Sequence, residues 1–177
     1  MPKDVVRRWI AERDALLRQH GVVPGPHWKA RLAQLPRTVQ QRLQWTLTER
    51  WDNDLDACHG ACVLRQPELA EIVYRSFLHF NGERYVITDF VIMPNHVHLL
   101  AAFPTEQAML DQCTSWQRYT AMQINRRRQQ RGAFWQEEGF DHLVRSPQHF
   151  EYYRRYIAEN PAKAHLRPGE YRRYSRV

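Results

Sequence analysis

V-I-M-P-N-H-V-H-L-L, residues 91–100, is the stretch on which the predicted fold of this chain depends. The overlapping run 85–93 (Y-V-I-T-D-F-V-I-M) is rich in β-branched and aromatic side chains, which favour strands. Pro94 and Asn95 have the chemistry of a turn, and residues 96–103 are again mostly apolar. The sequence therefore predicts a β-hairpin with its turn between two strands.

Two histidines stand two positions apart where the second strand of this hairpin begins. Side chains alternate between the two faces of a strand, so His96 and His98 are expected on one face. Two imidazoles on one face can hold one metal ion. A plainer interpretation also fits the pattern, in which both histidines only occupy a half-exposed strand face.

Composition and charge limit the classes of protein to consider. The 177 residues, 43% of them hydrophobic, are enough for one domain with a hydrophobic core. The formal net charge of +7 and the pI near 9.7 favour a polyanionic partner, with nucleic acid first. No apolar run reaches the roughly 18 residues that span a bilayer, and no signal peptide is evident, so we expect a cytoplasmic protein without a membrane partner. The three cysteines form no C-x-x-C pair and predict neither a disulfide framework nor a four-ligand zinc site.

The chain from residue 61 onward is predicted to alternate strands and helices. The expected elements are a strand at 61–64, a helix from 67 to about 80, strands at 85–93 and 96–103, a helix from 105 to about 131, a strand at 141–145 and a helix from 147 to 161. This order predicts an α+β fold, a ferredoxin-like antiparallel sheet with helices packed on one face. Two helical patterns, at 4–19 and 36–51, fill a segment 1–54 that is expected to belong to the same domain.

The last predicted helix carries a second pair of polar side chains. Tyr156 and Asn160 are four residues apart and can therefore share a helix face. A phenol and an amide oxygen would then point to the same place. The alternative is that Tyr156 is a core aromatic with a solvated hydroxyl, and that Asn160 only ends the helix before Pro161.

Three blocks of this sequence together resemble one family of enzymes. They are residues 93–100 (M-P-N-H-V-H-L-L), 134–145 (F-W-Q-E-E-G-F-D-H-L-V-R) and 156–163 (Y-I-A-E-N-P-A-K). The blocks resemble the single-tyrosine HUH transposases, within the insertion-sequence 200-like transposase superfamily, and more narrowly the REP-associated tyrosine transposase branch. The resemblance covers the chain from about residue 55 to about residue 166.

The resemblance implies a bacterial enzyme that cleaves and rejoins single-stranded DNA next to palindromic hairpins, through a 5′-phosphotyrosine intermediate. Residues 55–177 would form the catalytic domain, with the catalytic helix near the C-terminus. Position by position, His96 and His98 match the metal-binding histidines, Tyr156 matches the nucleophile and Asn160 matches the third metal ligand. Glu159 is the reserve ligand. The implied cofactor is a divalent metal ion, Mg²⁺ or Mn²⁺.

Basic residues are expected to bind the DNA. The candidates are Arg126, Arg127, Arg128, Arg131, Lys163, Arg172, Arg173 and Arg176. The first four also fit a solvated helix C-terminus, where cations complement the helix dipole. In the tail, Tyr171 and Tyr174 alternate with arginines, so we expect them to stack on unpaired bases while the arginines hold phosphates. The expected partner is a single-stranded DNA hairpin, and a homodimer is a further expectation.

One departure from the family pattern keeps other functions open. Members of the branch carry a β-strand ahead of a segment like residues 2–9 (P-K-D-V-V-R-R-W), and this sequence begins at Met1, so the sheet is expected to have an unfilled place. The first alternative function is a catalytically silent hairpin-binding protein. The second is a metal-dependent nuclease that forms no covalent adduct.

Overall fold

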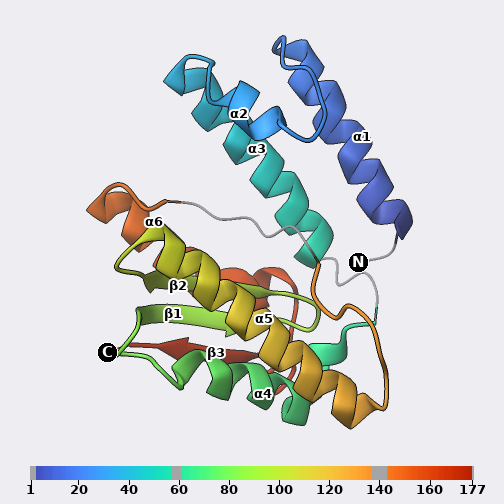
Figure 1. The fold of residues 1–177 in the computed structure, drawn as a ribbon, viewed down its shortest axis with the longest axis vertical. Helices are drawn as coiled ribbons and strands as arrows, with labels where there is room; N and C mark the ends of the chain where they lie inside the picture. The colour runs from blue at the N-terminus through green and yellow to red at the C-terminus, as the bar shows by residue number, and fades with distance from the viewer. Residues whose placement is uncertain (1–2, 57–60, 137–142, 177) are drawn as a thin grey trace. The chain divides into compact units, whose positions relative to one another are not determined.

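The computed structural model describes residues 3–56, 61–136 and 143–176. The chain divides into two compact units, Met1–Ala61 and Cys62–Val177 (Figure 1). The sequence predicts one domain, in which a helical segment 1–54 precedes the part that resembles the transposases. The observed division lies a few residues later. Each unit has its own hydrophobic core.

The first unit consists of α1 (Lys3–Gln19), α2 (Trp28–Leu32) and α3 (Arg37–Asp56). Its core is formed by buried side chains of the three helices and of the loop after α1, namely Leu17, Val22, Trp28, Leu32, Leu43 and Leu47. The Arg13 guanidinium lies over two indole rings, 5.3 Å from the centroid of Trp9 and 5.4 Å from that of Trp28. The helices predicted at 4–19 and 36–51 are confirmed, with α3 longer than expected.

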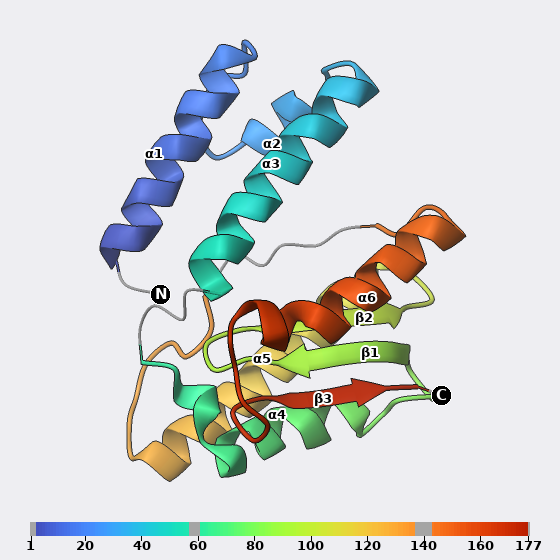
Figure 2. The same ribbon diagram turned by 180° about the vertical axis from the view of Figure 1, so that it is seen from behind.

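The second unit is built on a three-stranded antiparallel sheet with the strand order β2-β1-β3. The strands are β1 (Val86–Ile92), β2 (Val97–Ala102) and β3 (Arg172–Ser175). The predicted hairpin is confirmed, because β1 pairs with β2 and places Ile92 opposite Val97. β3, from the end of the chain, pairs along the other edge of β1 (Figure 2). β1 is therefore the central strand, with a neighbour on each side.

Two other predicted strands are not found among the residues that the structure describes. The structure has a 3₁₀ turn, η1 (Val63–Arg65), where the sequence predicts a strand at 61–64. Cys62 adopts a left-handed backbone with a φ of 41°, which interrupts an extended run. Residues 143–145 are irregular and pair with none of the three strands, and residues 141–142 lie outside the described residues. β3 was not predicted, because its residues read as a basic tail.

Helices cover both faces of the sheet. α4 (Pro67–Leu78) and α5 (Glu106–Arg128) pack on one face, and α6 (Pro147–Lys163) packs on the other (Figures 1 and 2). The predicted α+β class with an antiparallel sheet is confirmed, and the placement of all helices on one face is corrected. Phe90 faces α4 while its neighbour Val91 faces α6, and both are fully buried. A central strand that is apolar on both sides needs cover on both sides.

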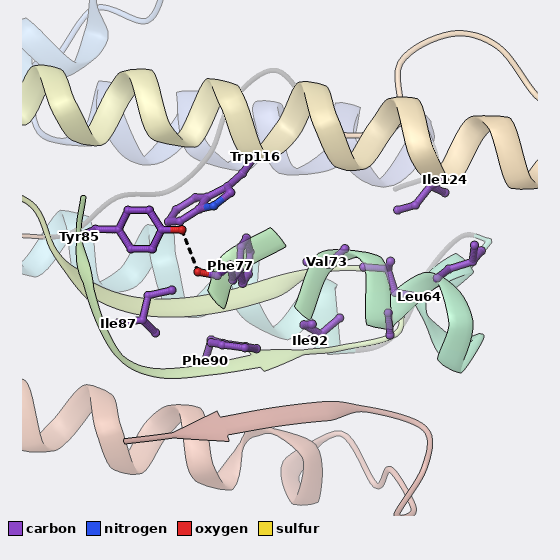
Figure 3. Close-up of a cluster of buried hydrophobic side chains, with 11 residues drawn as sticks. Leu64, Val73, Phe77, Tyr85, Ile87, Phe90, Ile92, Trp116 and Ile124 are labelled. Atoms are coloured by element: carbon purple, nitrogen blue, oxygen red, sulfur yellow. Dashed lines mark hydrogen bonds between the residues drawn. The ribbon is translucent and has the colours of Figure 1, made fainter. Parts of the chain in front are cut away.

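The face toward α4 and α5 holds the larger hydrophobic core (Figure 3). Phe77 packs edge-on against Phe90 and Trp116, with ring centroids 5.3 Å and 4.9 Å away. The Tyr85 hydroxyl donates to the Phe77 carbonyl at 2.9 Å, which satisfies its buried polar end. A register shift in β1 directly after Ile87 turns that side chain to the same face as Phe90.

Polar side chains fix where the two longest helices of this unit begin. Thr105 Oγ1 accepts from the backbone N–H of Ala108 at the start of α5, and Ser146 Oγ accepts from that of His149 at the start of α6, both at 3.1 Å. The three predicted helices are confirmed, although α5 ends slightly early because Gln129 has a left-handed φ of 52°. Across the described ranges, no helix has the length and apolar character that crossing a membrane requires.

Candidate active site

His96 and His98 lie next to each other on the face of the sheet that α6 covers. His98 is a residue of β2 and stands opposite Val91 of β1, while His96 ends the turn between the strands. The two Nε2 atoms are 2.9 Å apart, and the ring centroids are 4.6 Å apart. The predicted sharing of one face is therefore observed, and two ring nitrogens meet at one point.

Both imidazoles are held in the neutral form. Burial, and then the neighbouring His98, keep the pKa of His96 well below its usual value. Burial lowers the pKa of His98 to about 4. Asn95 Oδ1 lies 2.8 Å from His96 Nδ1, a contact that favours the tautomer with the ring proton on Nδ1 and the lone pair on Nε2. Neutral imidazole with a free Nε2 lone pair is the form that binds metal ions.

α6 brings Tyr156 to the histidines. Ile157 is buried against Val91 and Leu100 of the sheet, and the preceding Tyr156 packs at the edge of the same cluster. The Tyr156 ring stands edge-on to the His98 ring, with centroids 5.1 Å apart and planes at 82°. The nucleophile expected from the resemblance therefore contacts one of the two expected metal ligands.

Asn160 is buried one helical turn after Tyr156, with no exposed surface. Its Oδ1 and its Nδ2 have no hydrogen-bond partner in the part of the chain that the structure describes. A buried amide without a hydrogen bond lowers the stability of the folded state by about 1–3 kcal/mol. Asn160 is therefore destabilising unless a ligand binds its amide. Among the described residues, no group of three His, Cys, Asp or Glu side chains is placed to hold a metal ion. The reserve candidate Glu159 is exposed and pairs with Lys163 at 3.5 Å.

Lys163 belongs to this site by its position. Its Nζ lies 5.1 Å from the centroid of the Tyr156 ring, in addition to its ion pair with Glu159. Lys163 is thus a positive charge held beside the candidate nucleophile.

The arginines predicted to bind DNA lie in two separate parts of the fold, near the end of α5 and in or directly after β3. Arg126, Arg127 and Arg128 lie in the last turn of α5, which packs on the sheet face away from the histidines, and Arg131 follows that helix. In β3, Arg172 makes an ion pair with Glu71 of α4 at 2.6 Å. Arg173 and Arg176 are exposed.

The two tyrosines of the tail, which the sequence suggests as base-stacking residues, are partly buried and pack against the fold. Tyr174 stacks on Phe90 with centroids 5.3 Å apart and planes at 17°. Tyr171 packs against the cluster formed by α6 and the sheet. Their rings are used inside the fold because the tail is the third strand of the sheet.

Sequence reasoning missed a buried ion pair beside the site. Asp89 of β1 is 1% exposed and lies 2.9 Å from the Nε of Arg154 in α6. Ser175 of β3 donates its hydroxyl to the other carboxylate oxygen at 2.7 Å. The available signal was a single acid within the otherwise apolar run 85–93.

In a comparison with models of protein families, residues 66–160 match the family described as transposase IS200 like. The chain belongs to the IS200-like transposase family. The match covers just over half of the chain and includes the two histidines, Tyr156 and Asn160. A search of curated proteins and a search of solved structures each found no significant match.

Membership in the IS200-like transposases identifies the protein as a DNA-processing enzyme of transposition. The resemblance to the superfamily is thereby confirmed. The matched segment spans α4, the β1–β2 hairpin, α5 and most of α6, which are the elements that carry the histidines and the tyrosine.

Proposed function

We propose that this IS200-like transposase cleaves and rejoins single-stranded DNA through Tyr156, next to a metal ion held by His96, His98 and Asn160. The observation that carries the proposal is the close approach of two neutral imidazoles and the Tyr156 ring. The buried amide of Asn160, one helical turn after Tyr156, has no hydrogen-bond partner among the described residues, and all four residues lie within the segment that matches the family. The turn before β2 supplies His96, β2 supplies His98, and α6 supplies Tyr156 and Asn160.

Tyr156 is the residue that forms and breaks bonds in this proposal. Its phenolate oxygen attacks the DNA phosphorus, the bond from phosphorus to the 3′ oxygen breaks, and that oxygen takes up a proton. The products are a 5′-phosphotyrosine and a free 3′-hydroxyl, and attack by a 3′-hydroxyl on the same phosphorus rejoins a strand. No outside energy source is needed because one phosphodiester replaces another.

Lys163 supports the attack. Free tyrosine has a pKa of about 10, so little phenolate is present at neutral pH. A positive charge beside the ring favours the charged form of the phenol, and the Lys163 ammonium is held 5.1 Å from the ring centroid. The same ammonium can bind the phosphate that is attacked.

His96, His98 and Asn160 supply two nitrogens and one oxygen to the metal ion. Bound Mg²⁺ or Mn²⁺ would neutralise the phosphate charge and polarise the phosphorus. The buried amide of Asn160 supports this ligand set, because it has no partner among the described residues and metal binding would give its oxygen one.

The DNA ligand that we propose is a hairpin of single-stranded DNA with its cleavage site near the stem, as in the REP-associated branch. The net charge of +7 supports a polyanion. Within β3, Arg173 stands opposite Val91, and Val91 stands opposite His98, so these three residues form one row across the sheet. Among the tail arginines, Arg173 is therefore the one that lies in the same row of the sheet as His98.

The proposal is tested by separating DNA binding from covalent attachment. The full chain is incubated with hairpin DNA and Mn²⁺, and a denaturing gel reports any covalent protein–DNA band. We expect Tyr156→Phe to abolish the band and to leave the dissociation constant for the hairpin within about twofold, because the ring is retained. Tyr152→Phe, one turn earlier on α6, is the matched control that keeps the band.

Two results would contradict the proposal. Equal loss of binding and attachment in Tyr156→Phe would mean that the phenol holds DNA and is not the nucleophile. Hairpin binding by the folded wild type without any covalent band would favour the silent binding protein.

A further inference from the structure

Asp89 is a buried acid in the middle of the central strand. It is 1% exposed and lies between Thr88 and Phe90, as the one charged residue of β1. A buried carboxylate is retained only where it is paired and hydrogen-bonded. Both of its oxygens are indeed used, one by Arg154 and one by Ser175.

These contacts join three elements at one carboxylate. Arg154 belongs to α6, Asp89 to β1 and Ser175 to β3, and each is bonded through its side chain. The hydrogen bond from Arg154 to Asp89 is the largest cause that raises the pKa of Arg154, which fits a firm pair. Arg154 also lies 3.7 Å from Glu151, an exposed residue of its own helix.

Arg154 is two residues before Tyr156 on the same helix. Ile157 and its neighbours make the apolar contacts between α6 and the sheet. Because such contacts are non-directional, they hold the helix at a fixed distance from the sheet but do not fix its rotation about its own axis. A charged hydrogen bond to one buried oxygen is directional and sets that rotation.

We propose that Asp89 is a positioning residue which, through Arg154, holds α6 at the rotation that places Tyr156 over the histidine pair. This inference rests on the proposed function, because it concerns the nucleophile assigned there. Ser175 fixes the second carboxylate oxygen, so the C-terminal strand takes part in aligning the helix. Neither Asp89 nor Arg154 touches the reacting atoms.

The test measures rate and binding separately in the full chain with Mn²⁺. At saturating hairpin DNA, Arg154→Ala is expected to slow covalent attachment by about 10- to 100-fold, because small misplacements of a reacting group cost that much. The dissociation constant for the hairpin is expected to stay within about twofold. Arg154→Lys keeps the charge and should recover part of the rate.

Arg75→Ala is the matched control. Arg75 also pairs with a carboxylate, that of Glu71 at 2.8 Å, but on α4 across the sheet from the tyrosine. This variant should attach to DNA at the wild-type rate. An equal loss of rate in both variants, or a parallel loss of hairpin binding in Arg154→Ala, would overturn the positioning role.

Hydrogen exchange of the amides gives a readout that does not need activity. We expect Arg154→Ala to speed exchange in α6 while exchange in α4 stays unchanged. If the wild type forms no adduct, the proposed function fails, and exchange alone decides the inference about α6. Unchanged exchange in α6 would overturn it.

Discussion

His96 and His98 show how burial prepares side chains for metal binding. In water a histidine is partly protonated near pH 6.5, and a protonated imidazole repels cations. Here burial moves both pKa values down, so the two rings stay neutral through the physiological range. The ring geometry then directs both Nε2 atoms to the same point.

The metal-free protein should lose stability in mild acid because of this pair. His98 takes a proton at about pH 6.5 when unfolded but at about pH 4 when folded, so the unfolded state binds more protons between these values. The contribution of His98 to the free energy of unfolding is constant well above pH 6.5 and falls toward pH 4, by about 3 kcal/mol in total. Urea denaturation in EDTA at several pH values measures it. His98→Gln should flatten the curve, and an unchanged slope would contradict the assigned burial.

Asn160 should matter more for metal binding than for folding. Because its amide has no partner among the described residues, Asn160→Ala removes an unsatisfied group and should change the metal-free free energy of unfolding by no more than about 1 kcal/mol. Mn²⁺ should raise the melting temperature of the wild type and raise that of Asn160→Ala clearly less. Thermal melts with and without Mn²⁺ measure both effects. A large loss in the metal-free protein with an unchanged Mn²⁺ effect would show a structural amide.

Periodicity explains which residues of the site could be predicted. The H-x-H spacing places two side chains on one strand face, and the spacing of Tyr156 and Asn160 places them on one helix face. The sequence could not show that α6 crosses the histidine strand at Tyr156. That contact depends on tertiary packing of Ile157.

At the scale of elements, β3 is the part of the fold that sequence patterns could not predict. R-R-Y-S has no apolar alternation, and these four residues are a strand because they pair with β1. The converse holds for residues 61–64, where an apolar run is interrupted by the left-handed Cys62. Long-range pairing decided the first case and local backbone geometry the second.

Arg172 and Arg173 point to opposite faces of β3, so we expect their substitutions to affect stability and DNA binding differently. Arg172 pairs with Glu71 and lies 4.7 Å over the Tyr74 ring, so Arg172→Ala should lower stability by about 0.5–1 kcal/mol with hairpin binding little changed. Arg173→Ala should leave stability unchanged, weaken binding and reduce the salt dependence by about one phosphate contact. Denaturation and binding titrations at several salt concentrations measure these effects. The opposite assignment would place the DNA on the α4 side of the sheet.

The segment that matches the family does not contain every strand of the sheet. The matched segment ends at Asn160, whereas the sheet is completed by β3 at the end of the chain. The expected unfilled place is not found beside β1, since β2 and β3 occupy its two edges. The central strand therefore has a neighbouring strand along each edge, with β3 paired to its second half.

Mass spectrometry of the protein–DNA adduct can identify directly whether Tyr156 is the residue that becomes joined to DNA. Trypsin, which cuts after arginine and lysine, separates residues 156–163 (Y-I-A-E-N-P-A-K) from residues 146–154, which carry Tyr152 and Tyr153. After reaction with hairpin DNA and nuclease trimming, the account predicts a 5′-nucleotide phosphate on the 156–163 peptide. A nucleotide on the 146–154 peptide, or cleaved DNA with both peptides unmodified, would contradict it.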